Sequence, residues 1–234
     1  MNIYFLVEGQ STETQIYPEW LLHLVPNLKR VSYYDQVSDN CYYLFSSNGI
    51  PSIYDDIINA IEDISNSGLY DYLVICLDAE ELTVEQRKNE IFSVLKDNKI
   101  ILNGLNLEII VQNRCFETWF LGNRKIFKQN PQFQDFIDLV KYYNVYNLDP
   151  ELMQKPACYS KSIAEFHRKY LSEMLKERKL YYSKSNPKII KEKYYLKELN
   201  KRVKICPSHL QSFQSFINFC NKINSIITNS NDIK

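Results

Sequence analysis

One run of six apolar residues constrains the fold of this chain more than any other feature. Residues 72–77 read Tyr-Leu-Val-Ile-Cys-Leu and stop at the charged Asp78. A half-exposed strand alternates apolar and polar side chains, whereas an uninterrupted apolar run is typical of a strand buried on both faces. Such strands belong to parallel sheets with helices on both sides, so this run favours an α/β protein.

The N-terminal half contains further strand and helix patterns in alternation. Strands are expected at residues 3–7, 41–47, 72–77 and 107–111, and helices at 16–24, 53–64 and 84–96. Beyond residue 131 the strand patterns fade, and helices are expected at residues 135–143, 162–179, 187–201 and 210–226. The sequence therefore predicts a parallel α/β sheet of about four strands flanked by helices in residues 1–128, with a basic helical C-terminal region, residues 129–234, packed on it.

Charge is divided unevenly between the two halves of the chain. Residues 1–120 contain 18 Asp and Glu against 7 Lys and Arg, whereas residues 121–234 contain 10 acids against 21 bases. One interpretation is that the two parts attract each other. The other is an acidic metal site served by a basic surface that recruits a polyanion, and charge alone leaves both open.

Several classes of protein are disfavoured. No segment approaches the roughly 18 consecutive apolar residues of a membrane helix, and the N-terminus lacks the features of a signal peptide, so we expect a cytoplasmic protein without a membrane partner. The six cysteines form no CxxC pair, which disfavours structural zinc and a disulfide framework. No GxxxxGK[ST] or GxGxxG motif is present, so ATP hydrolysis by this chain is not expected.

Two carboxylates directly follow two of the predicted strands. Glu8 comes after residues 3–7, Asp78 comes after residues 72–77, and Glu80 lies two positions further. Ligands of open parallel sheets bind outside the carboxyl ends of the strands, and Mg²⁺ or Mn²⁺ prefers oxygen ligands. The competing interpretation is that acids after strands are helix N-caps or solvated loop residues.

Three segments resemble the toprim (topoisomerase-primase) pattern. Residues 6–13 read Leu-Val-Glu-Gly-Gln-Ser-Thr-Glu, and residues 77–80 read Leu-Asp-Ala-Glu, which gives one strand ending in Glu-Gly and a later strand ending in an acid pair. Residues 114–121, Arg-Cys-Phe-Glu-Thr-Trp-Phe-Leu, are similar to the Cys-Phe-Glu-x-Trp segment of RloB-like toprim proteins from bacterial defence loci. The resemblance covers residues 3–121 in three pieces and implies a toprim-like α/β fold.

This resemblance implies a metal-dependent nuclease. Toprim nucleases, including the overcoming-lysogenization-defect family, bind Mg²⁺ through the first Glu and the acid pair, so the implied ligands of Mg²⁺ or Mn²⁺ are Glu8, Asp78 and Glu80. Position 80 more often carries Asp in the family. Glu13 is a fourth ligand if the turn absorbs an extra residue, and otherwise an acid facing the helix dipole. The resemblance also implies a role in anti-phage defence with a partner ATPase of the AAA or ABC type.

Further residues are expected in the catalytic centre. Glu117 would hold a second metal or act as general base with Glu8, or it is the N-terminal acid of a core helix. Lys184 lies in a predicted loop before a helix and would reach the leaving oxygen, with Lys161 as a rival. Arg114 would contact the scissile phosphate or pair with a nearby acid.

A basic stretch at residues 161–204 is expected to bind nucleic acid. It contains 14 Lys and Arg against 5 Asp and Glu, interleaved with tyrosines. Lysines neutralise phosphates and tyrosines stack on unpaired bases, although lysine runs are also ordinary solvated faces. The expected contacts are Arg114, Lys161, Lys184, Lys188 and Arg202.

The sequence thus supports one leading hypothesis and two alternatives. The leading hypothesis is an Mg²⁺- or Mn²⁺-dependent endonuclease that acts on DNA or RNA, either as a monomer or as a homodimer. The second is a non-catalytic nucleic-acid-binding or regulatory subunit with a degenerate toprim site. The third is a toprim-like phosphotransferase or primase fragment, which the lack of a nucleotide-binding partner domain disfavours.

Overall fold

The computed structural model describes residues 1–231, and it confirms the predicted parallel α/β sheet. Five strands form one sheet in the order β2-β3-β1-β4-β5. The strands are β1 (Asn2–Val7), β2 (Lys29–Arg30), β3 (Cys41–Ser46), β4 (Tyr72–Asp78) and β5 (Asn106–Gln112). The additional strand is β2, whose two residues are exposed and too few to give a readable period-two pattern.

The chain is organised as two compact units. We call the first the sheet unit, made of Met1–Leu77, Val84–Val111 and the residues from Ser215 onward, and the second the helical unit, made of Asp78–Thr83 and Gln112–Gln214. The division therefore follows the ends of β4 and β5 rather than the predicted boundary at residue 128. Residues 232–234 of the predicted C-terminal region lie outside the described residues.

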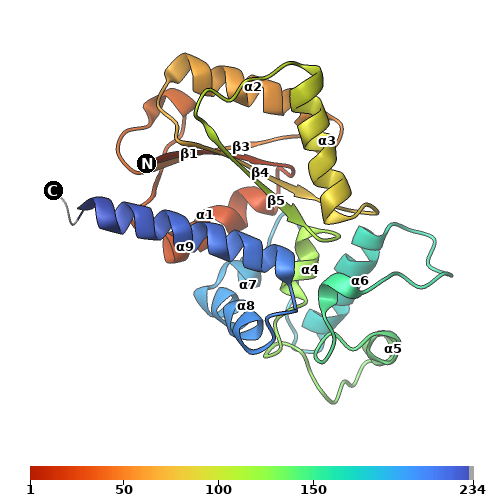
Figure 1. Ribbon diagram of the computed structural model, residues 1–234. Helices are drawn as coiled ribbons and strands as arrows, with labels where there is room; N and C mark the ends of the chain where they lie inside the picture. The colour runs from red at the N-terminus through yellow and green to blue at the C-terminus, as the bar shows by residue number, and fades with distance from the viewer. Residues whose placement is uncertain (232–234) are drawn as a thin grey trace. The chain divides into compact units, whose positions relative to one another are not determined.

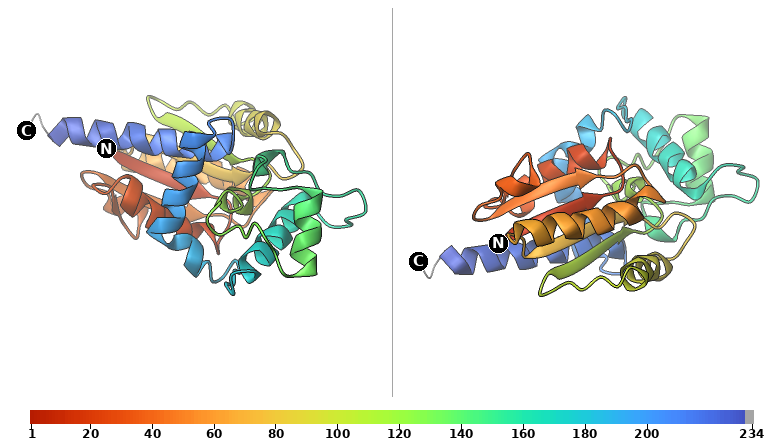
Figure 2. Two further views of the ribbon diagram at one scale, coloured as in Figure 1. Left: turned by 90° about the horizontal axis from the view of Figure 1, so that it is seen from below. Right: turned by 90° about the horizontal axis from the view of Figure 1, so that it is seen from above.

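The sheet unit has helices on both faces of the sheet. These helices are α1 (Glu13–Leu24), α2 (Ser52–Ser67), α3 (Val84–Asp97) and most of α9 (Gln211–Asn231), and a short 3₁₀ turn, η1 (Tyr34–Gln36), follows β2. Helices α2 and α3 cover one face, and α1 and α9 cover the other (Figures 1 and 2). Residues 72–77 are all buried, as their unbroken apolar run predicted.

Most of the last helix belongs to the sheet unit, because its aromatic side chains complete the core there. The ring of Phe219 lies 6.3 Å from that of Phe5 and 5.7 Å from that of Tyr72. The ring of Phe216 lies 5.3 Å from that of Tyr17. This helix, the last of the predicted C-terminal region, therefore closes one face of the sheet.

The helical unit contains short helices joined by long connections. They are α4 (Phe116–Phe120), α5 (Gln134–Tyr142), η2 (Pro150–Leu152), α6 (Ile163–Lys176), α7 (Lys188–Lys191) and α8 (Lys193–Ile205). The single helix predicted at residues 187–201 is divided at Glu192, whose backbone is extended. Across residues 1–231, no helix has the length and apolar character needed to span a membrane.

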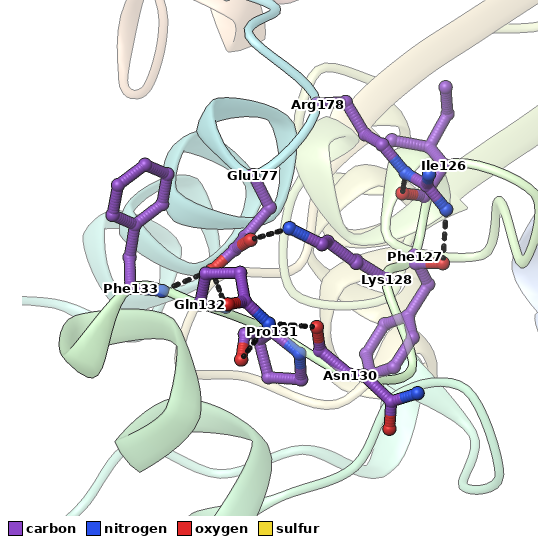
Figure 3. A network of polar contacts seen from close by, with 9 residues as sticks. All are labelled: Ile126, Phe127, Lys128, Asn130, Pro131, Gln132, Phe133, Glu177 and Arg178. Carbon is purple, nitrogen blue, oxygen red and sulfur yellow. Dashed lines mark hydrogen bonds and ion pairs between the residues drawn. The ribbon is translucent and has the colours of Figure 1, made fainter.

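A buried carboxylate fixes the end of α6 to the connection before α5 (Figure 3). Glu177 accepts hydrogen bonds from the backbone N–H groups of Gln132 and Phe133, at 2.7 and 2.6 Å, and pairs with the ammonium of Lys128 at 2.9 Å. The guanidinium of Arg178 donates to the carbonyls of Ile126 and Phe127. These bonds set where α6 ends, and this helix carries much of the candidate site described next.

Candidate functional site

The sheet reverses its strand order between β1 and β4. From β1 the chain first builds β2 and β3 on one side, and then β4 and β5 on the other. Strands β1 and β4 are paired in parallel with Val7 opposite Cys76. Glu8 directly follows β1, and Asp78 is the last residue of β4. The prediction that each acid stands at the carboxyl end of a strand is confirmed, and open sheets bind ligands outside these ends at such a reversal.

The turn after β1 places the carboxylate of Glu13 against Gly9. A Cβ atom at position 9 would overlap this carboxylate, so any other residue there would require the Glu13 side chain to move. Glu13 is the first residue of α1 and is 9% exposed. Glu8 is half-buried, and its backbone carbonyl accepts a hydrogen bond from the N–H of Gly49 at 3.1 Å. The turn thus brings Glu13 beside the residue that follows Glu8, while its role as a metal ligand stays a prediction.

The residues that follow β4 and β5 are tied to each other within the helical unit. The N–H of Ala79 donates to the carbonyl of Gln112 at 2.9 Å, and the N–H of Glu80 donates to that of Arg114 at 2.7 Å. Glu80 and Arg114 have φ of 53° and 75°, the left-handed region that non-glycine residues seldom adopt. Such strain costs about 1–3 kcal/mol per residue and is concentrated at functional sites.

Arg114 is bonded to backbone rather than to an acid side chain. Its Nη1 donates to the carbonyls of Glu80 and Leu82, both at 3.3 Å. The predicted pairing with a nearby acid is therefore replaced by contacts that hold the residues after β4. Its predicted contact with a phosphate stays a prediction.

Two carboxylates shape the electrostatics around Cys115. Burial, followed by the negative charges of Glu117 and Asp78, raises the pKa of the Cys115 thiol well above its usual value. Glu117 is 3% exposed and accepts a hydrogen bond from the hydroxyl of Tyr182 at 3.0 Å. Asp78 and Glu117 thus create a negative field within the helical unit, and Glu117 lies in the interior as the N-terminal acid of a core helix.

Helix α6 is fastened to both of these acidic segments. The N–H of Ile163 donates to Glu81, three residues after Asp78, at 3.0 Å. His167 is buried, with Nδ1 2.8 Å from the hydroxyl of Thr118 and Nε2 3.0 Å from the carbonyl of Met153. Because a carbonyl only accepts, Nε2 carries the proton and Nδ1 accepts from Thr118. Burial lowers the pKa of His167 to about 4, so this contact is between neutral groups at pH 7.

A cavity of about 620 Å³ opens along α6, and we call it the basic cavity. It is lined by Tyr159, Lys161, Glu165, Arg168, Lys169, Ser172, Tyr182, Ser183 and Lys184. Four of these residues are cationic and one is anionic. The cavity brings together Lys161 and Lys184, which the sequence predicted for nucleic-acid binding, and Tyr182 links its wall to Glu117.

The charged side chains of the basic cavity contact one another. The carboxylate of Glu165 lies 3.5 Å from the ammonium of Lys161 and 3.7 Å from the guanidinium of Arg168. The ammonium of Lys169 lies 5.9 Å from the ring centre of Tyr159. Sequence reasoning did not single out Arg168, Lys169 or Ser172. Their spacing from Glu165 is that of a single helix face, and this periodicity is the signal that would have found them.

Three predicted nucleic-acid contacts lie outside this cavity: Arg114, described above, Lys188 and Arg202. Lys188 is exposed and begins α7. Arg202 is only 1% exposed, and its guanidinium donates to carbonyls of the surrounding connections. A phosphate cannot reach a guanidinium buried in this way, so the assignment of Arg202 to a nucleic-acid surface is corrected: it serves the interior of the helical unit.

Within residues 1–231, no group of three or more His, Cys, Asp or Glu side chains is gathered closely enough to hold a metal ion. The predicted set of four carboxylate ligands stays a prediction. Comparison of the chain with protein-family models, with curated proteins and with solved structures finds no match. The likeness to toprim proteins therefore rests on the three sequence segments and on a fold consistent with them.

Proposed function

We propose that this chain is a nuclease that hydrolyses phosphodiesters of DNA or RNA with Mg²⁺ or Mn²⁺. The observation that carries the proposal is the hydrogen bond from Tyr182 to Glu117. Tyr182 stands in the wall of the basic cavity, and Glu117 shares the surroundings of Cys115 with Asp78. The helical unit therefore contains both carboxylates, which suit a cation, and the lysines of the basic cavity, which suit a phosphate.

The donor chemistry suits a hard divalent cation. Asp78 and Glu80, at the end of β4, would hold it. Mg²⁺ usually takes only one or two carboxylates and completes its shell with water and substrate phosphate, so a group of three acids is not required. When bound, such a cation polarises the phosphodiester and makes water a better nucleophile.

The other residues have positioning and binding roles in this proposal. Lys161 and Lys184 bind phosphate oxygens, and Lys184 also supplies a proton to the leaving oxygen. Because Glu117 is buried and already bonded to Tyr182, we assign it to holding Tyr182 in place rather than to contact with the substrate. The strained backbones of Glu80 and Arg114 support a functional role for the ends of β4 and β5.

A second candidate function is nucleic-acid binding without hydrolysis. It is favoured by the lack of a group of three potential metal ligands among the described residues and by Glu rather than Asp at position 80. In either function a partner ATPase, a role in anti-phage defence, a cytoplasmic location and a homodimer remain part of the proposal.

Incubation with plasmid DNA, single-stranded DNA and tRNA, in Mn²⁺ or in EDTA, tests the proposal. We expect cleavage of at least one substrate in Mn²⁺ only, and a loss of at least about 100-fold for Asp78→Asn, because altering even the surroundings of metal ligands costs 10–100-fold. Asp138→Asn is the matched control, an exposed acid on α5 whose loss should leave the rate unchanged. Binding of single strands without cleavage of any substrate, even with the partner ATPase present, would support the second candidate instead.

A further inference from the structure

The basic cavity carries more positive charge than a phosphodiester requires. Its lining contains four cations, Lys161, Arg168, Lys169 and Lys184, and one carboxylate, Glu165, so the net charge of the lining is +3. A phosphodiester inside a nucleic-acid strand has a single negative charge. A phosphate monoester carries about −1.5 to −2 near neutral pH and has three acceptor oxygens. The charge of this cavity is therefore better matched by a terminal phosphate than by an internal one.

Two of the four cations share one carboxylate partner before a ligand arrives. Glu165 is fixed by the capping box of α6, in which its N–H donates to the hydroxyl of Ser162 and its carboxylate accepts from the N–H of Ser162. The same carboxylate pairs with Lys161 and Arg168. Cations fixed by a common partner lose less conformational freedom on binding, which favours affinity.

The remaining walls suit the rest of a nucleotide. The ring of Tyr159 is packed edge-on against Phe166 at 5.2 Å, and the ring of Tyr182 is packed against Phe120 at 6.1 Å. The hydroxyls of Ser172 and Ser183 add hydrogen-bond donors to the lining. A volume of about 620 Å³ lies in the range of about 300–1,000 Å³ that small-molecule pockets occupy.

We propose that the basic cavity binds the terminal phosphate monoester of a nucleotide, either at the end of a single strand or on a free mononucleotide. The strand end as a source rests on the proposed function, since a nuclease meets such ends in its substrates and products. Binding of the phosphate itself needs neither a metal ion nor hydrolysis.

Fluorescence anisotropy in EDTA tests this inference without cleavage. The probes are a labelled ten-nucleotide thymidine strand with a 5′-phosphate, the same strand with a 3′-phosphate, and the strand with hydroxyls at both ends. We expect one phosphorylated strand to bind at least about 10-fold tighter than the unphosphorylated strand, because the phosphate monoester adds charge-assisted hydrogen bonds to the cations of the cavity. Equal affinities of all three strands would overturn the inference.

Two variants locate the effect in the cavity. Lys169→Met and Lys184→Met, which come from different segments, should each remove most of the preference for the phosphorylated strand. Lys141→Met, which changes an exposed side chain of α5, should retain it. Retention of the preference in both cavity variants would overturn the inference. Circular dichroism spectra matching the wild type confirm that each variant is folded.

Competition identifies the source of the phosphate. Displacement of the labelled strand by a mononucleotide monophosphate at similar concentration would support a free nucleotide, whereas displacement only by a phosphorylated strand would support a strand end. Displacement by inorganic phosphate and by unphosphorylated nucleoside equally well would count against a nucleotide site. A phosphorylated-strand preference in a protein that never cleaves would refute the nuclease proposal and leave this inference standing.

Discussion

The two units bury acidic, basic and histidine side chains to very different extents. Among the residues that the structure describes, the buried acids, bases and histidines of the sheet unit are Glu13 and Arg87. Those of the helical unit are Glu117, Asp149, Glu151, His167, Glu177 and Arg202. The sheet unit obtains its core from apolar side chains, and the helical unit builds polar groups into its interior.

The cause of this difference is the backbone. A sheet pairs its own N–H and C=O groups along the ladder, so its side chains are free to be apolar. The helical unit has short helices and long connections, whose buried backbone groups need other partners. Arg202 donates to the carbonyls of Gly122, Val145 and Leu148, and Asp149 accepts from the N–H groups of Glu151 and Leu210. In the helical unit, these side chains provide the backbone hydrogen bonds that paired strands provide in the sheet.

The largest effect is expected from removing Arg202. Arg202→Met keeps an apolar stem but leaves the carbonyls of Gly122, Val145 and Leu148 buried without this donor, so we expect a loss of about 3–5 kcal/mol in unfolding free energy. Hydrogen exchange followed by mass spectrometry measures the change in each unit. Exchange should accelerate in α5 and α8 and stay slow in β1 and β4.

The exposed neighbour Lys201 provides the control, because Lys201→Met removes a charge without touching these carbonyls. If Arg202→Met accelerated exchange equally in β1 and β4, the two units would unfold as one and the contrast between them would not extend to stability. If it weakened nucleic-acid binding without loss of stability, our correction of its role would be wrong.

The same contrast explains which parts of the fold the sequence predicted. The predicted strand at residues 72–77 corresponds to β4 (Tyr72–Asp78), and the predicted helix at 84–96 corresponds to α3 (Val84–Asp97). Both have a pattern that can be read from the sequence, because one or both of their faces are buried. Arg202 was placed on the surface because it lies in a lysine-rich stretch. Its burial depends on carbonyls more than 50 positions away in the chain, to which local patterns give no guide.

The second prediction concerns a glutamate that burial tends to keep neutral. Burial raises the pKa of Glu151 to about 7 from an ordinary 4.5, even though Ser212 donates to its carboxylate. The folded-state pKa is the higher one, so the stabilising contribution is complete below about pH 4.5 and is lost as the pH rises through 7. A shift of this size corresponds to about 3 kcal/mol. Glu151→Gln, which stays neutral, should escape this loss.

Trp119 is a natural reporter for this measurement, because its indole N–H donates to the hydroxyl of Ser212 at 2.7 Å. The measurement is urea unfolding followed by Trp119 fluorescence in a Trp20→Phe background. The unfolding free energy of Glu151→Gln minus that of the protein with Glu151 should rise by about 3 kcal/mol from pH 4.5 to 7.5. His167 has the opposite effect, since its lowered pKa favours the folded state above pH 6.5, but it cancels in this difference. A difference independent of pH would contradict the prediction.

The candidate site was predicted in part for the same physical reason. The positions of Glu8 and Asp78 at the ends of β1 and β4 were predicted correctly, because strand ends can be read from the sequence. Of the residues that line the basic cavity, the sequence predicted only Lys161 and Lys184 as site residues. The cavity itself could not be predicted, because it forms only when the turn at Ser183 lies beside α6. The hydrogen bond from Tyr182 to Glu117 joins residues 65 positions apart, so the local sequence around either residue could not predict it.

The smallest effect is expected from Glu177, the buried carboxylate of Figure 3, whose pH dependence has the opposite sign to that of Glu151. Burial alone would raise the pKa of Glu177, but the N–H of Phe133 and the ammonium of Lys128 outweigh it, so the pKa is lowered. Its stabilising contribution is therefore present above about pH 4.5 and is lost as the pH falls through the lowered folded-state pKa.

Glu177→Gln should cost about 1–3 kcal/mol at pH 7, because the amide oxygen still accepts from both backbone N–H groups but the amide nitrogen presents a donor to Lys128. Urea unfolding followed by Trp119 fluorescence measures this cost, which should shrink below pH 4.5 as the wild-type carboxylate becomes protonated. Glu173→Gln, one turn earlier on α6 with a weak surface pair to Lys176, is the matched control and should change stability by less than about 1 kcal/mol. If the cost of Glu177→Gln persisted unchanged at low pH, the packing of the side chain rather than its charge would hold the connection before α5. The helical unit would then be stabilised by packing, as the sheet unit is.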